Sequence, residues 1–471
     1  MLLIKSASTY KPEREYICYV LFGEFLGINY KIQFEDRNDW CITGDDGAEL
    51  LMPDIFFQTP DDQWLTQCSL PDQPLKTWNA RQSGMKIRMT KNQIPVIYGD
   101  LSFGQKQKSA QVAGIRKTLT IPIDIIGSSF FMLSRYEEVV KKERDEHDRF
   151  PAWASLAYQE GFIDRPIVNE YLEILWTYMK SLWPRLRRKE RTFQMRVTCD
   201  VDHPYQDGLR NPMRQIRTIG ADLIRRKNPL LAAKSAFNYL ASRFGNYSFD
   251  PYLSAIYWIM DVNEKAGKRV TFYFKAGQTD PQFDSAYSLD DPIARKLLRD
   301  IHDRGHEIGL HPSYRTYWDA EQLCIEANNL RRVLEEEKIY QNRLGSRQHY
   351  LRWDSAITPA ILGKAGIDYD TTLSFADHAG FRCGTAMSFT MWNWQERRQS
   401  ICRQKPLILM ECTIISSRYM NLGYTRKALS YMMLLLERST KFGGNFTILW
   451  HNSHLISKKD NEFYKTIISY F

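Results

Sequence analysis

The chain of 471 residues lacks the features that mark several protein classes. None of its eight cysteines forms a CxxC pair and their spacing shows no disulfide framework, so we interpret them as reduced thiols of a cytosolic protein. The first residues lack the apolar segment and cleavage site of a signal peptide. The most apolar early run, 17–28, contains Glu24 and is too short to span a bilayer. These absences predict a cytoplasmic protein without a transmembrane helix.

A nucleic-acid-binding module is also missing, because the Lys and Arg residues are not arranged around an aromatic platform. The net charge of +9 is modest for this length, and it permits an anionic substrate or a membrane surface without requiring either. Many basic residues fall in the stretch 206–250, where they alternate with leucine and phenylalanine in a predicted helical insertion. We expect a surface helical pair there. A cap over the active site and a peripheral contact with an anionic membrane are the alternatives.

The length and composition predict a globular protein of two or three domains. Residues 1–190 contain short apolar runs separated by turn signals, followed by helical patterns, and predict a mixed α/β domain of unknown role. The basic run 185–191 is interpreted as a linker. From residue 252 onward, strands and helices alternate, which favours a parallel barrel or a doubly wound sheet. In both architectures, ligands gather at the carboxyl ends of the strands.

The first polar cluster at such a strand end contains Asp200 and Asp202, followed directly by His203. At a strand tip, both carboxylates can point into one pocket. One can then bind a divalent metal while the other activates a water molecule. The same DxD pattern also occurs in metal-dependent glycosyltransferases and in ordinary acidic loops.

Three further clusters follow later strands. His311 comes at the end of the strand 307–310, which suits a zinc ligand, although a surface or core histidine is the alternative. Residues 347–352 combine two arginines with one histidine, as in a site that holds a carboxylate and steers an anion, or in a solvated basic turn. His451 follows the strand 446–450 and suits a general acid that protonates a leaving amine, or a hydrogen-bonded structural histidine.

Together these clusters resemble the polysaccharide deacetylase family (carbohydrate esterase family four), a metal-dependent group acting on N-acetylated sugars. The similarity covers about 195–455. Residues 198–202 resemble the first motif of the family, residues 305–311 the second, Arg347 the third and residues 449–451 the last. The whole chain is similar to a bacterial subgroup, often from Bacteroidetes, with an extra N-terminal domain. Segments 130–138, 347–353 and 376–385 carry that similarity.

The resemblance implies a distorted or incomplete (β/α) barrel at 195–471 and removal of an N-acetyl group from a bacterial polysaccharide, surface glycan or sugar precursor. A divalent metal, expected to be zinc, would be bound by Asp202 and His311. Asp200 would be the catalytic base and Arg347 its orienting partner. His451 would be the acid.

One position departs from the family pattern. The second motif of the family has another histidine four residues after the first, and here that position is Arg315. We expect His203 to supply the third ligand, with His349 as the other candidate. His349, Tyr350 and Arg352 are otherwise expected to contact the substrate. Two protein ligands completed by water, a carbohydrate-binding pseudoenzyme without metal, and a DxD glycosyltransferase are the alternatives.

Overall fold

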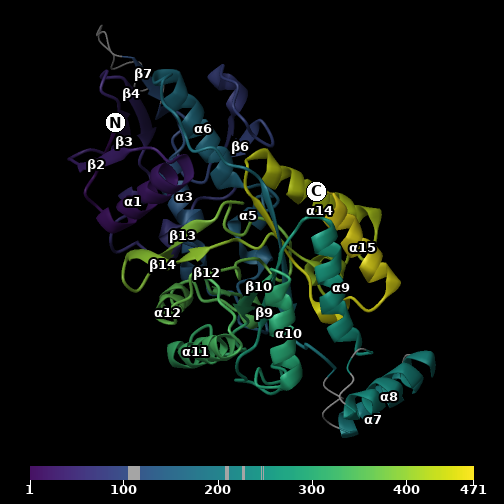
Figure 1. The fold of residues 1–471 in the computed structure, drawn as a ribbon. Coiled ribbons are helices and arrows are strands. Elements are labelled where there is room, and N and C mark those ends of the chain that lie inside the picture. Colours follow the sequence, from purple (N-terminus) through teal and green to yellow (C-terminus); the bar gives the residue numbers. More distant parts are fainter. Residues whose placement is uncertain are drawn as a thin grey trace.

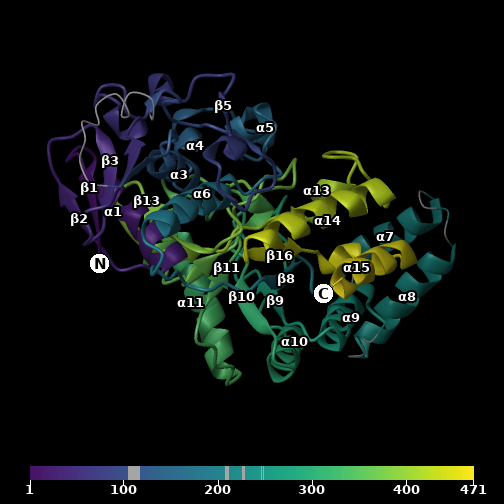
Figure 2. The same ribbon diagram turned by 90° about the horizontal axis from the view of Figure 1, so that it is seen from above.

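The computed structural model describes residues 1–103, 117–206, 212–224, 227, 229–244, 247 and 249–470. It contains a five-stranded sheet near the N-terminus, a nine-stranded sheet formed by the rest of the chain, and a separate two-stranded hairpin. The five-stranded sheet lies at one end of the molecule, and the helix pair α7–α8 lies at the opposite end (Figures 1 and 2).

The five-stranded sheet has the strand order β2-β1-β3-β4-β7 and mixes parallel with antiparallel pairs. On neighbouring strands β1 and β3, Ile4 lies opposite Ile42 and both are fully buried, as expected for apolar side chains on the inner face of a strand. The strands of this region are β1 (Leu2–Ser6), β2 (Tyr30–Phe34), β3 (Asp39–Thr43), β4 (Glu49–Pro53), β7 (Thr118–Thr120) and the hairpin β5 (Thr77–Asn79) with β6 (Gln93–Pro95).

Several helices of this region contact one of the two sheets: α1 contacts β14 of the nine-stranded sheet, and α6 contacts β4 of the five-stranded sheet. Asp124 begins α3 by accepting a hydrogen bond from the backbone N–H of Gly127 at 2.8 Å. A Cβ at Gly127 would lie 2.6 Å from Phe56 Cβ, so this close approach requires glycine. The helices are α1 (Lys11–Cys18), η1 (Tyr19–Leu26), η2 (Phe56–Gln58), η3 (Gln67–Ser69), η4 (Ala80–Ser83), α3 (Ile125–Leu133), α4 (Tyr136–Val140), η5 (Ala152–Ala154), α5 (Leu156–Gln159) and α6 (Ile167–Leu182).

The nine-stranded sheet has the order β13-β14-β12-β11-β10-β9-β8-β16-β15, and every neighbouring pair except β13–β14 is parallel. Its edge strands β13 and β15 do not pair with each other, so the sheet is open within the described residues. The strands are β8 (Gln194–Val201), β9 (Val270–Phe274), β10 (Glu307–Leu310), β11 (Gly345–Ser346), β12 (Tyr369–Asp370), β13 (Phe389–Asn393), β14 (Arg398–Gln404), β15 (Leu409–Met410) and β16 (Asn445–Leu449).

Helices connect these strands, and several begin with a side-chain cap. Asp250 accepts from the backbone N–H groups of Tyr252 and Leu253, both at 2.9 Å, and Pro251 occupies the first turn. The helices are α9 (Pro251–Lys265), α10 (Pro292–Asp303), α11 (Ala320–Glu336), η7 (His349–Leu351), α12 (Thr358–Lys364), α13 (Glu411–Ile415), α14 (Arg426–Lys441), η8 (Asn452–His454) and α15 (Lys458–Ser469).

The predicted insertion at about 206–250 contains two helices, α7 (Pro212–Ile224) and α8 (Pro229–Arg243), which pack against each other. Residues 207–211, 225–226, 228, 245–246 and 248 of this stretch lie outside the described residues. Among the described helices of the chain, none is both long and apolar enough to cross a membrane.

The expected α/β architecture with a mainly parallel sheet is therefore confirmed in its coarse form: a nine-stranded sheet without closure, preceded by a mixed α/β region. One continuous core of buried apolar side chains includes residues from both sheets. Buried polar contacts also join them. Glu138 on α4 accepts two hydrogen bonds from Arg382, each 2.8 Å long, and the Tyr16 hydroxyl donates to the carbonyl of Thr390 at 2.9 Å.

Candidate active site

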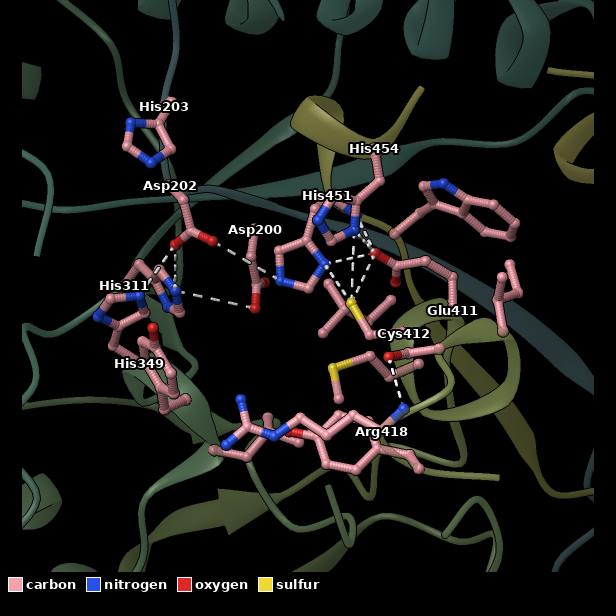
Figure 3. A pocket seen from close by; sticks show the side chains of 18 of the residues that line it. Asp200, Asp202, His203, His311, His349, Glu411, Cys412, Arg418, His451 and His454 are labelled. Atoms are coloured by element: carbon pink, nitrogen blue, oxygen red, sulfur yellow. Dashed lines mark hydrogen bonds and ion pairs between the residues drawn. The ribbon is translucent and has the colours of Figure 1, made fainter. Parts of the chain in front are cut away.

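The ends of four parallel strands bring the polar clusters to one edge of the nine-stranded sheet. Asp200 is the penultimate residue of β8, and Asp202 directly follows that strand. His311 follows β10, Arg347 follows β11 and His451 follows β16. Parallel strands place their carboxyl ends together, so these side chains become neighbours despite their separation in sequence. They surround or adjoin a cavity of about 550 Å³ (Figure 3).

Asp202, His311 and His349 point their donor atoms toward one another. The Oδ1 atom of Asp202 lies 3.2 Å from the Nε2 atom of His311 and 3.2 Å from the Nε2 atom of His349. Asp202 Oδ1 and His311 Nε2 are both buried, yet neither makes a hydrogen bond. Buried polar atoms of this kind are rare without a partner, and one carboxylate with two imidazoles is a donor set that suits a divalent metal. These residues therefore fit a metal ion.

Both imidazoles are held with their Nε2 lone pairs directed toward this group. His311 donates from Nδ1 to the carbonyl oxygen of Arg347 at 2.5 Å, and His349 donates from Nδ1 to Asp284 Oδ1 at 2.8 Å. Because a carbonyl or carboxylate can only accept, the proton of each neutral ring belongs on Nδ1. Burial lowers the pKa of His349, which favours the neutral ring. Burial opposes ionisation of Asp284, but hydrogen bonds from His349 and backbone N–H groups hold its pKa at about 2.

The third residue of this group is His349, whereas the sequence led us to expect His203. His203 lines the same cavity, but its ring lies on the far side of Asp202 from His311 and His349 (Figure 3). Asn452 donates to the carbonyl of His203 at 2.8 Å, which ties this segment to η8 instead. Arg315, at the position of the family histidine, has an exposed side chain that pairs with Asp280 at 3.0 Å. The backbone after β10 thus directs residue 315 to solvent.

Asp200 lies beside this group and is held by a fully buried arginine. Arg347 donates to Asp200 Oδ1 at 2.9 Å and to the hydroxyl of Thr198 at 2.7 Å. The other carboxylate oxygen of Asp200, Oδ2, lies 3.9 Å from His311 Nε2. The guanidinium also lies over the ring of Tyr273, 4.8 Å from its centroid. Arg347 therefore fixes one oxygen of Asp200 and leaves the other directed at the donor group.

His451 approaches Asp202 from the opposite direction and is paired with a carboxylate that sequence reasoning missed. Its Nδ1 donates to Glu411 Oε1 at 2.5 Å, and its Nε2 lies 3.8 Å from Asp202 Oδ2. Burial opposes protonation of His451, but the charge of Glu411 raises its pKa well above the usual value. A protonated His451 would present Nε2–H to the cavity. Glu411 directly follows β15, so it lies at a strand end like the other residues of the site.

Lys275 is a second residue that the sequence analysis missed. It follows β9, is almost fully buried, and places its Nζ atom 3.5 Å from Asp202 Oδ1. Burial opposes ionisation of Asp202, but the charge of Lys275 outweighs it and holds the pKa of this carboxyl well below its usual range. The position of Lys275 directly after β9 was the signal that the sequence offered. A lysine there is also common as an ordinary surface residue.

Of the two expected substrate contacts beside His349, the structure brings only Tyr350 to the cavity. Tyr350 adopts the left-handed backbone conformation, with φ 61°. Arg352 is buried behind it and does not line the cavity. Its donors are engaged by the backbone carbonyls of His147 at 2.8 Å and Tyr314 at 2.9 Å, which explains why it is not directed at the cavity.

The N-terminal region contributes to the same cavity. Arg149 lines it, donates to the carbonyl of Tyr350 at 3.0 Å, and is held by Asp145 at 2.8 Å. The neighbouring Glu146 pairs with Arg418, another cavity residue. These contacts join distant parts of the chain through a loop without a distinctive spacing, so the sequence offered no signal for them.

Comparisons with known proteins are limited in extent. The profile of a family of unknown function, DUF7033, matches residues 2–184. A solved structure from Mycobacterium smegmatis, described as that of a candidate polysaccharide deacetylase, is similar with 15% sequence identity and a TM-score of 0.38. The similarity covers 60% of this chain and 84% of that one. No curated protein matches the sequence.

Proposed function

We propose that this protein is a metal-dependent hydrolase that removes an N-acetyl group from a carbohydrate. The observation that carries the proposal is the convergence of Asp202, His311 and His349, with Asp202 Oδ1 and His311 Nε2 both buried and without a hydrogen bond. Asp200 and His451 flank this donor group from two directions. A base, an acid and a metal-binding group around one cavity form a set that can hydrolyse an amide.

The metal would be held by Asp202, His311 and His349, with zinc as the expected ion. Three protein ligands leave a position open, as in catalytic zinc sites. A bound ion of this kind supplies Lewis-acid chemistry, which polarises a carbonyl and makes water more acidic. His349 rather than His203 is our third ligand, because its Nε2 lies 3.2 Å from Asp202 Oδ1 and its Nδ1 is anchored by Asp284.

The remaining steps are assigned to side chains of the chain itself. Asp200 removes a proton from the attacking water, and Arg347 orients Asp200 through their 2.9 Å contact. His451 donates a proton from Nε2 to the departing amine, and Glu411 stabilises the protonated ring at Nδ1. Lys275 offers a further positive charge beside Asp202, 3.5 Å from its Oδ1 atom, which can stabilise negative charge that develops in the cavity.

A carbohydrate substrate is supported by the shape and lining of the cavity. Its volume of about 550 Å³ suits one or two sugar rings. Tyr350, Tyr419 and Phe283 present aromatic rings that can stack on a sugar.

We further propose an N-terminal unit, 1–190, and a catalytic unit, 195–471. In this division the N-terminal unit completes the cavity wall through Arg149.

The experiment is an assay of acetate release from N-acetylated saccharides. The zinc-loaded protein should release acetate, and Asp202→Ala, His311→Ala or a chelator should abolish it. Arg315→Ala serves as a matched control, because this exposed side chain lies outside the donor group. Undiminished release in both alanine variants and in chelator would overturn the proposal. A purified protein that holds no zinc and releases no acetate from any saccharide would instead identify a carbohydrate-binding pseudoenzyme, and tight nucleotide-sugar binding would identify a glycosyltransferase.

A further inference from the structure

A second group of metal-binding side chains lies on the other side of His451. The donor atoms of Glu411, Cys412, His451 and His454 all lie within 4.8 Å of one another. The close-up shows them converging opposite Asp202 (Figure 3). Glu411 and Cys412 begin α13 after β15, whereas His451 and His454 follow the adjacent parallel strand β16. The sheet edge that forms the first donor group therefore also forms the second.

The separations between these atoms resemble those in a tetrahedral metal site. Cys412 Sγ lies 3.4 Å from His454 Nδ1, 3.8 Å from His451 Nδ1 and 3.4 Å from Glu411 Oε1. Ligand atoms about 2.0–2.3 Å from a zinc ion are separated by roughly 3.3–3.8 Å. The oxygen of Glu411 is closer to the imidazole nitrogens, 2.9 Å from that of His454, as in a hydrogen bond that a cation would replace.

Burial and access also favour a ligand at this position. Glu411 is 2% exposed, and three neighbours contact its Oε1 atom while its Oε2 atom has no partner. Cys412 is half-buried, and the side chain of His454 is 51% exposed, so an ion can reach the group from solvent. The proposed hydrolysis uses neither Cys412 nor His454, which leaves their convergence without another role.

We propose that these side chains form a second divalent cation site. The ligands are the thiolate of Cys412, Nδ1 of His454 and the carboxylate of Glu411, with Nδ1 of His451 as the fourth. A thiolate and imidazoles select zinc over magnesium or calcium. Binding displaces the thiol proton and the ring protons at Nδ1 into solvent. One consequence rests on the proposed function: a cation at Nδ1 of His451 removes its pairing with Glu411, so excess zinc should inhibit acetate release.

Cobalt titration of the metal-free full chain tests the site without reference to activity. The wild-type protein should bind two equivalents, and the weaker one should produce the near-ultraviolet charge-transfer band of a cobalt–thiolate bond. Cys412→Ser should lose this band and one equivalent, and Cys68→Ser, which changes another accessible thiol, should keep both. His454→Gln should weaken the same equivalent by at least about tenfold. A wild-type protein without the band, or a band that survives Cys412→Ser, would overturn the proposal.

The helix pair α7–α8 exposes large apolar side chains to solvent and buries polar ones between its helices. Exposed apolar residues recur at helical spacing along one side of each helix. They are 50–80% exposed: Met213, Ile216, Leu223 and Ile224 on α7, and Leu230, Phe237 and Leu240 on α8. Phe244, directly after α8, is 89% exposed. So many large apolar side chains in contact with water mark a surface that meets another phase or molecule.

The contact between the two helices is polar instead. Ser235 on α8 donates to Asp222 Oδ2 on α7 at 2.9 Å, and Gln215 donates to the carbonyl of Ser235 at 2.6 Å. Asn238 and Ser242 on α8 are also buried, where Asn238 donates to Gln206 and Asp250, and Ser242 to the carbonyl of Tyr239. An ordinary surface helical pair buries its apolar side and exposes its polar side. This pair does the reverse among its described residues.

The positive charge of residues 207–249 indicates an anionic partner. Residues 207–249 contain eight Lys or Arg residues and two Asp, and Asp222 is buried between the helices. Lys227, Lys234 and Arg243 are exposed. We infer that the α7–α8 pair lies on the surface of an anionic lipid bilayer, with its apolar side chains at the acyl boundary and its basic side chains at the headgroups. The pair contacts the membrane without spanning it.

Vesicle flotation of the full chain tests this assignment. The protein should float with vesicles of phosphatidylglycerol and phosphatidylcholine at low salt, and binding should fall steeply with phosphatidylcholine alone. The double variant Ile224→Ser/Phe244→Ser should bind at least about 10²-fold more weakly. Ile401→Ser, at a site that is 76% exposed in β14, should bind like the wild type. Absence of flotation would overturn the inference, as would a dimer that the double variant dissociates, because a second copy would then cover this side.

Discussion

Replacing His349 by glutamine should greatly weaken zinc binding, whereas the same replacement at His203 should leave it unchanged. The reason is geometric: His349 Nε2 lies 3.2 Å from Asp202 Oδ1, and its ring is fixed by a 2.8 Å hydrogen bond to Asp284. His203 lines the same cavity, but its ring lies on the far side of Asp202 from this group (Figure 3). The pair of variants therefore compares one chemical change at two positions around the same aspartate.

The expected magnitude follows from the number of ligands. Four-ligand zinc sites in small peptides bind with about 10–16 kcal/mol, or roughly 2.5–4 kcal/mol per ligand. Removing a pre-oriented ligand should therefore weaken binding by about 10²- to 10³-fold. Asp284→Asn removes the charge behind the ring and one of the two accepting oxygens, so a loss of about 10- to 100-fold is expected. Asp284 also accepts backbone hydrogen bonds from Thr279 at 3.0 Å and Asp280 at 2.9 Å, and one amide oxygen cannot retain them all.

The measurement is competition for zinc against a chromophoric chelator. Each variant is prepared in a Cys412→Ser background, so that a cation held by Cys412 does not contribute. Near-ultraviolet circular dichroism of each variant checks that the fold is retained. If His349→Gln binds zinc like its parent and His203→Gln does not, the third ligand is His203 and our assignment of the site is wrong. Equal and strong binding by both variants would leave a site that needs neither histidine, which would also refute the reasoning.

Three further predictions follow from other contacts. Asp200→Asn should reduce acetate release by about 10²- to 10⁴-fold with little change in zinc affinity, because Asp200 is bound by Arg347 and lies outside the Asp202 group; a parallel loss of zinc in a metal assay would make it a ligand instead. Glu138→Gln should lower the free energy of unfolding in urea by about 3–5 kcal/mol, because buried Glu138 pairs with Arg135 and Arg382; a loss under about 1 kcal/mol would contradict this. Burial raises the pKa of Asp370 to about 6 in the folded chain, above its unfolded value of about 4. The folded chain therefore gains about 3 kcal/mol of stability at a pH below about 4, where Asp370 is neutral. This gain is lost as the pH rises from about 4 through 6. Asp370→Asn should remove that fall in stability between pH 4 and 6, and unfolding curves with equal pH slopes in both proteins would rule it out.

Strand-end chemistry could be predicted because it is a local pattern. An apolar run followed by Asp200 and Asp202, or by His311 or His451, is visible in a few consecutive residues. Parallel pairing of β8 with β9 and β16 then places such ends side by side without further information. Glu411 and Lys275 follow strands in the same way, yet their pattern is too common to separate them from ordinary surface residues.

The third donor of the metal-binding group required the path of the backbone. Arg315 stands at the sequence position of the family histidine, but its backbone leads the side chain to solvent and Asp280. His349 lies against Asp202, and the chain then turns through two consecutive residues in the left-handed conformation, Tyr350 at φ 61° and Leu351 at φ 56°. Neither residue is glycine, so the left-handed turn cannot be predicted from the composition of this segment.

The sequence by itself determined the α/β class, the four polar clusters and the mixture of basic and apolar residues at 206–250, because each is a property of neighbouring residues and their spacing. Only the tertiary structure decided that His349 joins Asp202 and His311, that Arg149 reaches the cavity from the N-terminal region, and that α7 and α8 bury their polar sides. These outcomes depend on contacts between segments far apart in the chain. Such contacts are selected by the packing of the whole molecule and leave no periodic signal in either segment alone.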